Sequence, residues 1–319
     1  MSDATASIRP VSRLRTSASF VRFEHTLFTL PLILAGVFSV AGPPMSAGRW
    51  LLVALAAVGA RTTAMSLNRL IDRRLDALNP RTRVRELPSG KMRPAEAWSL
   101  LAAALAAYLA ACWALDPVGS FYLRLAAIPV AIFTLYPYTK RFTPFCHFGV
   151  GAGMCLAPLA GYVAAHPDLT WPWPAIWLTA FTFFWGSGFD IIYSTLDEES
   201  DRVNGIHSMV TWLGRKRALA VSAFLHVVAF ASLALAGSGA IASATGPSPV
   251  WFNPAGPPTY SGMILMAAML AVAGVLLFLE QRWAENVNLA FFKVNVWVSL
   301  FALLMILASH YRGTPWRAI

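Results

Sequence analysis

Apolar runs of about 17 to 23 residues recur along the whole chain, and short polar or proline-rich segments such as AGPPMSAG and LDPVGS separate them. A bilayer core is crossed by about 20 apolar residues in a helix. The pattern therefore predicts an all-α fold, a polytopic membrane bundle of nine transmembrane helices. The predicted spans are residues 27–43, 50–70, 95–114, 121–138, 146–165, 174–194, 218–240, 260–280 and 290–309.

The composition supports a membrane protein. Of the 319 residues, 57% are hydrophobic and only 13% are charged, whereas soluble domains carry about 25% charged residues. The net charge of +10 would otherwise suggest a nucleic-acid partner. The basic residues are dispersed between the apolar runs, however, so we expect no nucleic-acid binding.

Cysteine and histidine usage indicates neither a disulfide framework nor a transition-metal site. The three cysteines lie in apolar stretches and form no CxxC pair, and the six histidines show no paired spacing. We therefore expect each histidine to serve packing or the membrane interface rather than to ligate a metal.

The basic residues also predict an orientation. If the N-terminus is cytoplasmic, most of the 25 basic residues fall on the cytoplasmic side, as the positive-inside rule requires. We expect residues 1–26 to form a cytoplasmic tail without a cleavable signal, 27–309 one transmembrane domain, and 310–319 a short tail on the outer side. These features indicate an integral protein of a bacterial inner membrane, surrounded by lipid and with no obligate protein partner evident.

Two acidic clusters stand out in this apolar chain. In NRLIDRRLD, the residues Asn68, Asp72 and Asp76 are spaced four apart, and in FDIIYSTLDEESD, Asp197 and Asp201 repeat that step. Residues at steps of four share one face of a helix. Both clusters follow a predicted span on the cytoplasmic side, four spans apart. This arrangement indicates a weak internal duplication whose halves face each other.

Acidic side chains gathered at a membrane edge require a counter-charge. Mg²⁺ binds oxygen ligands and commonly combines one or two carboxylates with substrate phosphate. Two facing clusters could therefore hold metal ions that clamp a diphosphate, while arginines contact its remaining oxygens. Two alternatives stay open. The acids could be charged helix ends paired with nearby arginines, or the chain could be a secondary transporter, although transporter charges usually lie near the bilayer midplane.

Four segments in this order resemble the UbiA family of intramembrane aromatic prenyltransferases: NRLIDRRLD, RVRELPSGKM, YPYTKRFTP, and YSTLDEESD followed by NGIHS. The resemblance covers nearly the whole chain. It implies a bundle of nine spans that uses Mg²⁺ and polyprenyl diphosphate and prenylates a small aromatic acceptor. The acceptor would be 4-hydroxybenzoate or a dihydroxynaphthoate in ubiquinone or menaquinone biosynthesis, and the segments are most similar to the menaquinone-type subgroup. Family branches with haem, chlorophyll or lipid acceptors remain an alternative.

The resemblance also implies roles for individual residues. One metal ion would be held by Asn68, Asp72 and Asp76, and the other by Asp197 and Asp201. Contacts to the diphosphate or to an acceptor carboxylate would come from Arg22, Arg73, Arg85, Lys140 and Arg141. Asp190 and Tyr193 lie one or two turns before the second cluster, and they are the candidate catalytic residues. Asp190 could act as a base, orient a ring hydroxyl, or be a buried acid paired with a neighbouring span.

Overall fold

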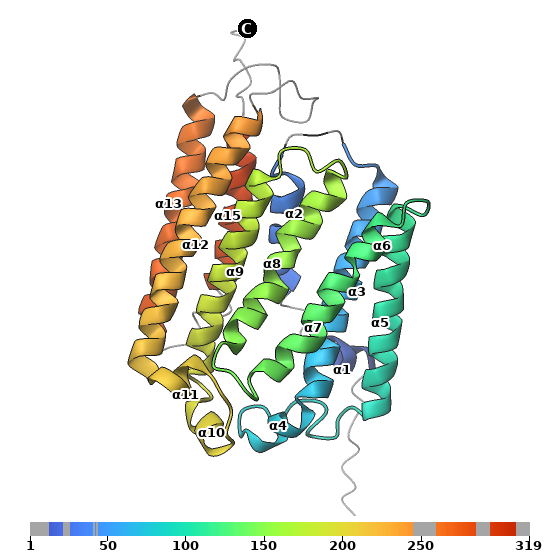
Figure 1. Cartoon of the computed structure of the whole chain (residues 1–319), viewed down its shortest axis with the longest axis vertical. Helices are drawn as coiled ribbons and strands as arrows, with labels where there is room; N and C mark the ends of the chain where they lie inside the picture. The colour runs from blue at the N-terminus through green and yellow to red at the C-terminus, as the bar shows by residue number, and fades with distance from the viewer. Residues whose placement is uncertain are drawn as a thin grey trace, which may run out of the picture.

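The computed structural model describes residues 13–21, 26–40, 42, 44–244, 260–284 and 294–310. Within these ranges the regular secondary structure is entirely helical, and the long helices run roughly parallel to form an elongated bundle (Figure 1). The all-α expectation is therefore confirmed for the described part of the chain.

Seven helices are long and apolar enough to cross a membrane. They are α3 (Ala47–Ile71), α5 (Pro94–Leu115), α6 (Phe121–Leu125) continued by α7 (Ala127–Thr139), α8 (Cys146–Ala165), α9 (Trp173–Ser194), α12 (Arg215–Ala244) and α13 (Tyr260–Arg282). Two shorter apolar helices, α2 (Thr26–Val37) and α15 (Asn295–Ser309), coincide with parts of the first and ninth predicted spans. The structure thus confirms a membrane bundle but does not confirm the count of nine spans.

The difference at the first span has a local cause. The predicted range 27–43 is apolar to its end, but α2 stops at Val37. The amide of Ser39 then bonds to the carbonyl of Gly36 at 3.2 Å, and the Ser39 hydroxyl donates to the same carbonyl at 2.7 Å. Such contacts satisfy the free carbonyls of a helix end. Of the tails predicted at 1–26 and 310–319, residues 1–12, 22–25 and 311–319 lie outside the described residues.

The core is centred on α9, which packs against α8 and α12. Leu178, Phe181 and Trp185 of α9 are fully buried, and the last two rings stack with centroids 5.5 Å apart. Lipid tails are as apolar as these side chains, so helix association in a membrane depends on close packing and interhelical hydrogen bonds rather than on the hydrophobic effect. Both kinds of contact are present around α9.

Close packing is clearest between α2 and α8. A Cβ atom added at Gly36 would lie 1.9 Å from the carbonyl oxygen of Pro158, and one added at Gly161 would lie 2.0 Å from that of Ile33. These are backbone atoms, which cannot rotate away. The pair of glycines therefore allows the two backbones to touch, as small residues commonly do in membrane bundles.

Interhelical hydrogen bonds connect α9 to α12 and α13. The Trp185 indole donates to Glu280 of α13 at 3.3 Å, and Ser222 of α12 donates to the carbonyl of Gly188 at 2.7 Å. Gln281 of α13 then donates to the Ser222 hydroxyl at 2.6 Å. This polar network fixes the rotation of α9 about its axis and so determines which of its side chains face the candidate site.

Four short helices gather at one end of the bundle, the lower end in Figure 1. They are α1 (Arg13–Phe20), α4 (Arg73–Leu78), α10 (Glu198–Val203) and α11 (Met209–Leu213). The helices α4 and α10 carry the second aspartate of each acidic cluster. Both clusters therefore lie at the same end of the molecule.

Candidate active site

The first acidic cluster lies where α3 ends and α4 begins. Asp72 is the residue between the two helices. Helical hydrogen bonding continues across this break, because the Asp72 amide bonds to the carbonyl of Asn68 at 2.9 Å and the Asp76 amide to that of Asp72 at 2.8 Å. Asn68, Asp72 and Asp76 therefore keep the shared face that their spacing indicates.

The second cluster repeats this arrangement at the end of α9. Asp197 precedes α10, and the Asp201 amide bonds to the Asp197 carbonyl at 2.7 Å. Asp190 and Tyr193 occupy the last two turns of α9. Each cluster thus joins a long apolar helix to a helix of six residues.

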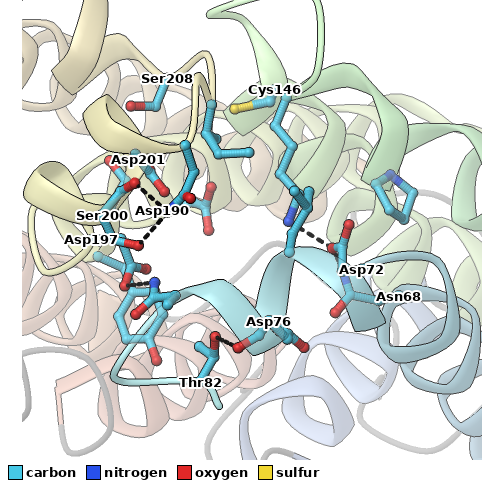
Figure 2. A pocket seen from close by; sticks show the side chains of 18 of the residues that line it. Asn68, Asp72, Asp76, Thr82, Cys146, Asp190, Asp197, Ser200, Asp201 and Ser208 are labelled. Atoms are coloured by element: carbon cyan, nitrogen blue, oxygen red, sulfur yellow. Dashed lines mark hydrogen bonds and ion pairs between the residues drawn. The ribbon is translucent and has the colours of Figure 1, made fainter. Parts of the chain in front are cut away.

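The two clusters face each other across a cavity of about 200 Å³. Figure 2 shows Asp72 and Asp76 on one wall, with Asp190, Asp197 and Asp201 on the opposite wall. The wall also includes residues of the α7–α8 corner and of the segment before α11. The polar and charged side chains that line it include Asn68, Asp72, Asp76, Arg81, Arg85, Lys140, His147, Asp190, Tyr193, Asp197 and Asp201.

Basic side chains neutralise the first cluster. Lys140 donates from Nζ to Oδ2 of Asp72 at 2.6 Å, and Arg141 approaches Oδ1 of the same residue at 3.7 Å. Arg85 donates from Nη1 to Oδ1 of Asp76 at 2.7 Å. Asp72 and Asp76 are only 1% and 6% exposed. Charges this deeply buried require such partners.

A single arginine holds the second cluster. Arg81, in the segment after α4, binds Asp197 through two parallel hydrogen bonds of 2.8 and 2.5 Å, and Asn79 adds a third bond of 2.7 Å. Arg81 also donates to the Tyr193 hydroxyl at 2.6 Å and lies over the Tyr193 ring at 4.7 Å. The segment that follows the first cluster therefore orients the second one.

Asp72, Asp197 and Asp201 have different electrostatic environments. Burial raises the pKa of Asp72 above its ordinary value, although Lys140 acts in the opposite direction. Burial also acts to raise the pKa of Asp197, but the hydrogen bonds and charge of Arg81 outweigh it and hold that pKa below its ordinary value. Burial, together with the nearby charge of Asp197, raises the pKa of Asp201 to about 7. Within the described residues the Asp201 carboxylate has no hydrogen bond or ion pair.

Asp190 is paired with a neighbouring span, one of the possibilities that the sequence left open. Its Oδ2 lies 2.6 Å from Nδ1 of His147, in the first turn of α8. His147 is 2% exposed, whereas the Asp190 side chain is 24% exposed. The pairing therefore leaves part of the carboxylate open to the cavity.

Two of the sequence-predicted contact residues, Arg73 and Arg141, are not among the residues that line the cavity. Arg73 is exposed on another face of α4. Arg141 lies at the rim, where it donates to the carbonyl of Ile71 at 2.8 Å and lies over the ring of Tyr138. Arg22 is outside the described residues. Arg85 and Lys140 line the cavity.

Sequence reasoning did not single out Arg81 or His147. Arg81 was one of several arginines in a predicted cytoplasmic loop, and only its position directly after Asn79 and Pro80 suggested that a turn could direct it back. His147 shares with the other five histidines the expectation of a packing or membrane-interface role. Its signal was its place at the start of a span, directly after the YPYTKRFTP segment.

The donor set fits Mg²⁺. Asp72 Oδ1 and Asp76 Oδ2 are buried and accept no hydrogen bond within the described part of the chain. Oxygen donors of this kind suit a hard cation. No group of three Asp, Glu, His or Cys side chains in the described ranges forms a metal site alone. Each cluster would therefore supply only part of a coordination shell, which is the usual habit of Mg²⁺ beside phosphate and water.

Comparison with other proteins gives consistent matches along the chain. The chain is 28% identical to a 4-hydroxybenzoate octaprenyltransferase of Cupriavidus necator, over 70% of this chain and 80% of the relative. It is 30% identical to the protein of the same name from Ralstonia nicotianae, over 70% of this chain and 78% of the relative.

Solved structures agree with this. The fold matches that of an apo UbiA homolog from Aeropyrum pernix K1 with a TM-score of 0.73 and 30% identity, covering 89% of this chain and 97% of that one. It also matches a UbiA homolog from Archaeoglobus fulgidus, solved with GPP and Mg²⁺, with a TM-score of 0.69 at 19% identity, covering 92% and 98% of the two chains. The profile of the UbiA prenyltransferase family spans residues 29–297. With its two acidic clusters meeting at one end of such a bundle, this chain belongs to the UbiA prenyltransferase family.

Proposed function

We propose that this protein uses Mg²⁺ to transfer a polyprenyl group from polyprenyl diphosphate to a small aromatic acceptor, 4-hydroxybenzoate or a dihydroxynaphthoate, in ubiquinone or menaquinone biosynthesis. The observation that carries the proposal is the cavity between the two acidic clusters, which is lined by carboxylates and by cations at once. The names of its relatives support the aromatic acceptor.

At the diphosphate, the carboxylates would bind the metal ions and the basic side chains would contact the phosphate oxygens. Mg²⁺ bound to Asn68, Asp72 and Asp76 and to Asp197 and Asp201 would neutralise charge on the leaving diphosphate. Lys140 and Arg85 now bind the same carboxylates, so they are close enough to donate to phosphate oxygens instead. Fixed cations that face the developing negative charge lower the barrier to its departure.

The deeper residues serve the acceptor. Loss of diphosphate leaves an allylic carbocation, and the π face of Tyr193 at the cavity wall attracts cations. The acceptor ring attacks this carbon and must then lose a proton. Asp190 presents the exposed part of its carboxylate to the cavity, so it is placed either to accept that proton or to orient the ring hydroxyl.

The membrane setting protects the reaction. An allylic cation survives only where water is excluded, and the cavity lies at the end of an apolar bundle. Several described basic residues lie at this same end of the bundle, including Arg81, Arg85 and Lys140. We therefore infer that the cavity faces the cytoplasm of a bacterial cell, that α2 and α15 complete nine spans, and that the C-terminus lies outside.

The experiment is prenyl transfer by purified protein in lipid discs. Polyprenyl diphosphates of several lengths and Mg²⁺ are supplied with 4-hydroxybenzoate, a dihydroxynaphthoate, a porphyrin or a lipid headgroup acceptor. We expect prenylation of one of the two aromatic acids and loss of turnover in Asp72→Ala and Asp197→Ala, both of which should remain inserted and folded. Arg83→Ala is the control, since Arg83 is exposed and lies outside the cavity wall.

Three results would count against the proposal. Full activity of either aspartate variant would remove the metal assignment. Transfer only to a porphyrin or a lipid would place the protein in another branch of the family, and solute flux without diphosphate would favour the transporter alternative.

A further inference from the structure

His147 connects two parts of the cavity wall that are far apart in the sequence. Its Nδ1 lies 2.6 Å from the carboxylate of Asp190 on α9. Its Nε2 accepts a hydrogen bond of 3.2 Å from the backbone amide of Met209, the first residue of α11. Both ring nitrogens of this buried side chain therefore bind elements of the candidate site.

These two contacts determine the tautomer. A backbone amide can only donate, so Nε2 must carry a lone pair. The ring proton then lies on Nδ1 and points at Asp190. A donor held on one carboxylate oxygen fixes the orientation of the carboxylate and leaves the other oxygen directed toward the cavity.

The segment before Met209 is bound to the α7–α8 corner, which also carries His147. The amide of His207 donates to the carbonyl of Lys140 at 2.8 Å, and the thiol of Cys146 contacts the carbonyl of His207 at 3.4 Å. Residues 207–209 are thus attached at three successive points to residues 140–147. At its other end the segment is tied to the second cluster, because the Ile206 amide bonds to the Asp201 carbonyl at 2.9 Å.

A chain of contacts therefore runs from the second acidic cluster to the candidate base. It passes from Asp201 through residues 206–209 to His147 and then to Asp190. Asn204, Ile206, His207 and Ser208 line the cavity, so a diphosphate bound there touches this segment directly. A shift of the segment moves the Met209 amide, and the imidazole can follow it only by turning against Asp190.

We propose that His147 is a positioning residue that couples the segment 204–209, at the diphosphate side of the cavity, to the orientation of Asp190 at the acceptor side. The inference rests on the proposed function, since it assigns the coupled groups to the two substrates. It accounts for a buried histidine whose partners are Asp190 of the cavity wall and the backbone of Met209, which directly follows the wall residue Ser208.

Two substitutions separate the two contacts. In His147→Asn, the side-chain amide stands near the position of Nδ1 and can still donate to Asp190, but it cannot reach Met209. In His147→Gln, the amide oxygen stands near the position of Nε2 and can still accept from Met209, but Asp190 loses its donor. His226→Gln is the control, because His226 is equally buried and its bond to Gln281 at 2.9 Å belongs to the polar network behind α9.

We expect the kinetic effects to split. His147→Gln should lower kcat by about tenfold or more, the lower range for a displaced acid–base group, with the KM for diphosphate nearly unchanged. His147→Asn should keep most of kcat and raise that KM severalfold. Amide hydrogen exchange of the peptide containing Met209 should accelerate in His147→Asn but not in His147→Gln. His226→Gln should reduce thermal stability but should show neither the selective fall in kcat nor the selective rise in KM.

The coupling would be overturned if both His147 variants showed the same change in kcat, the same change in KM and the same rate of amide exchange at Met209. The exchange measurement needs no acceptor and no turnover. A wild-type protein that prenylates nothing, while the exchange at Met209 still differs between the two variants, would refute the proposed function and leave the structural connection intact.

Discussion

The two acidic clusters share one backbone plan but differ in how their charges are supported. Asp72 and Asp197 each stand between a long helix and a helix of six residues, and Asp76 and Asp201 each occupy the fourth position of that short helix. In the first cluster both aspartates are buried, and a separate cation binds each one. In the second cluster Arg81 binds Asp197, and within the described residues Asp201 has no cationic contact.

This difference indicates that the first cluster contributes more to holding the bundle together, whereas the second cluster is freer to bind a ligand. The first cluster is part of the bundle, since its ion pairs connect α3 and α4 to the α7–α8 corner. The second cluster depends on one arginine from the opposite half of the cavity wall. Its other carboxylate, Asp201, forms no ion pair within the described residues. Similar spacing in a sequence therefore does not imply similar energetics.

The largest expected effect tests this division directly. Asp72→Asn and Asp201→Asn make the same chemical change, and both should lower turnover by at least about 100-fold because each removes a negatively charged ligand of the proposed Mg²⁺ ions. Without Mg²⁺, however, Asp72→Asn should lower the Tm, since it leaves Lys140 beside a neutral amide. Asp201→Asn should keep or raise the Tm. Turnover assays and thermal unfolding measure the two effects, and equal Tm changes would show that the clusters are alike.

A smaller effect is expected at the arginine that joins the clusters. Arg81→Lys keeps the charge but loses the paired bonds to Asp197 and the contact with Tyr193. A bond to a charged group contributes about 2 kcal/mol, which corresponds to about 30-fold in turnover. Arg83→Lys, two residues along the same segment and exposed, should stay within about twofold. A similar loss of turnover in both variants would mean that turnover depends on the positive charge of the segment rather than on the paired hydrogen bonds of Arg81.

Arg85→Lys should be milder than Arg81→Lys. Arg85 reaches Asp76 through one nitrogen and one oxygen, and a lysine ammonium can replace a single bond of this kind. We expect a loss of about 1 kcal/mol, or about fivefold in turnover. Steady-state kinetics with varied diphosphate would detect it. A larger loss than in Arg81→Lys would indicate that the first cluster, rather than the second, requires the exact arginine geometry.

The smallest effect is a pH dependence of stability. In the folded protein the pKa of Asp201 is raised to about 7, above its unfolded value, so the ionised form opposes folding. Relative to Asp201→Asn, the Mg²⁺-free wild type should lose stability as pH rises from about 4 to 7 and then show a constant deficit. The Tm difference between the two proteins, measured across pH 4 to 9, should grow by a few degrees over that interval. A difference that shrinks with rising pH would contradict this environment for Asp201.

Sequence patterns predicted the spans best where hydrophobicity and helix ends coincide. The range 146–165 agrees with α8, and 174–194 agrees with α9 to within one residue. At the first span the apolar run continues past a helix end where the amide and the hydroxyl of Ser39 both donate to the carbonyl of Gly36. Periodicity also placed each acidic cluster on one face, and positive charges assigned both clusters to the same side of the membrane.

The partners of those acids could not be predicted in the same way. Arg81 and Asp197 are 116 positions apart, and the pairing depends on how α4 and α9 are placed against each other. The same holds for His147, whose role depends on Asp190 and Met209 together. Spacing describes one helix at a time, whereas these contacts arise from the packing of several.

The position of Cys146 has a practical consequence. Cys146 is the first residue of α8 and lines the cavity together with Ser208 (Figure 2), whereas Cys112 is buried and Cys155 lies further along α8, outside the cavity wall. A water-soluble maleimide should therefore alkylate the native protein chiefly at this one sulfur, and a bound diphosphate should slow the labelling. Mass spectrometry of the labelled protein, with no cysteine introduced, would then measure how much of the site is occupied by diphosphate. The measurement needs no turnover, so it also applies to inactive variants.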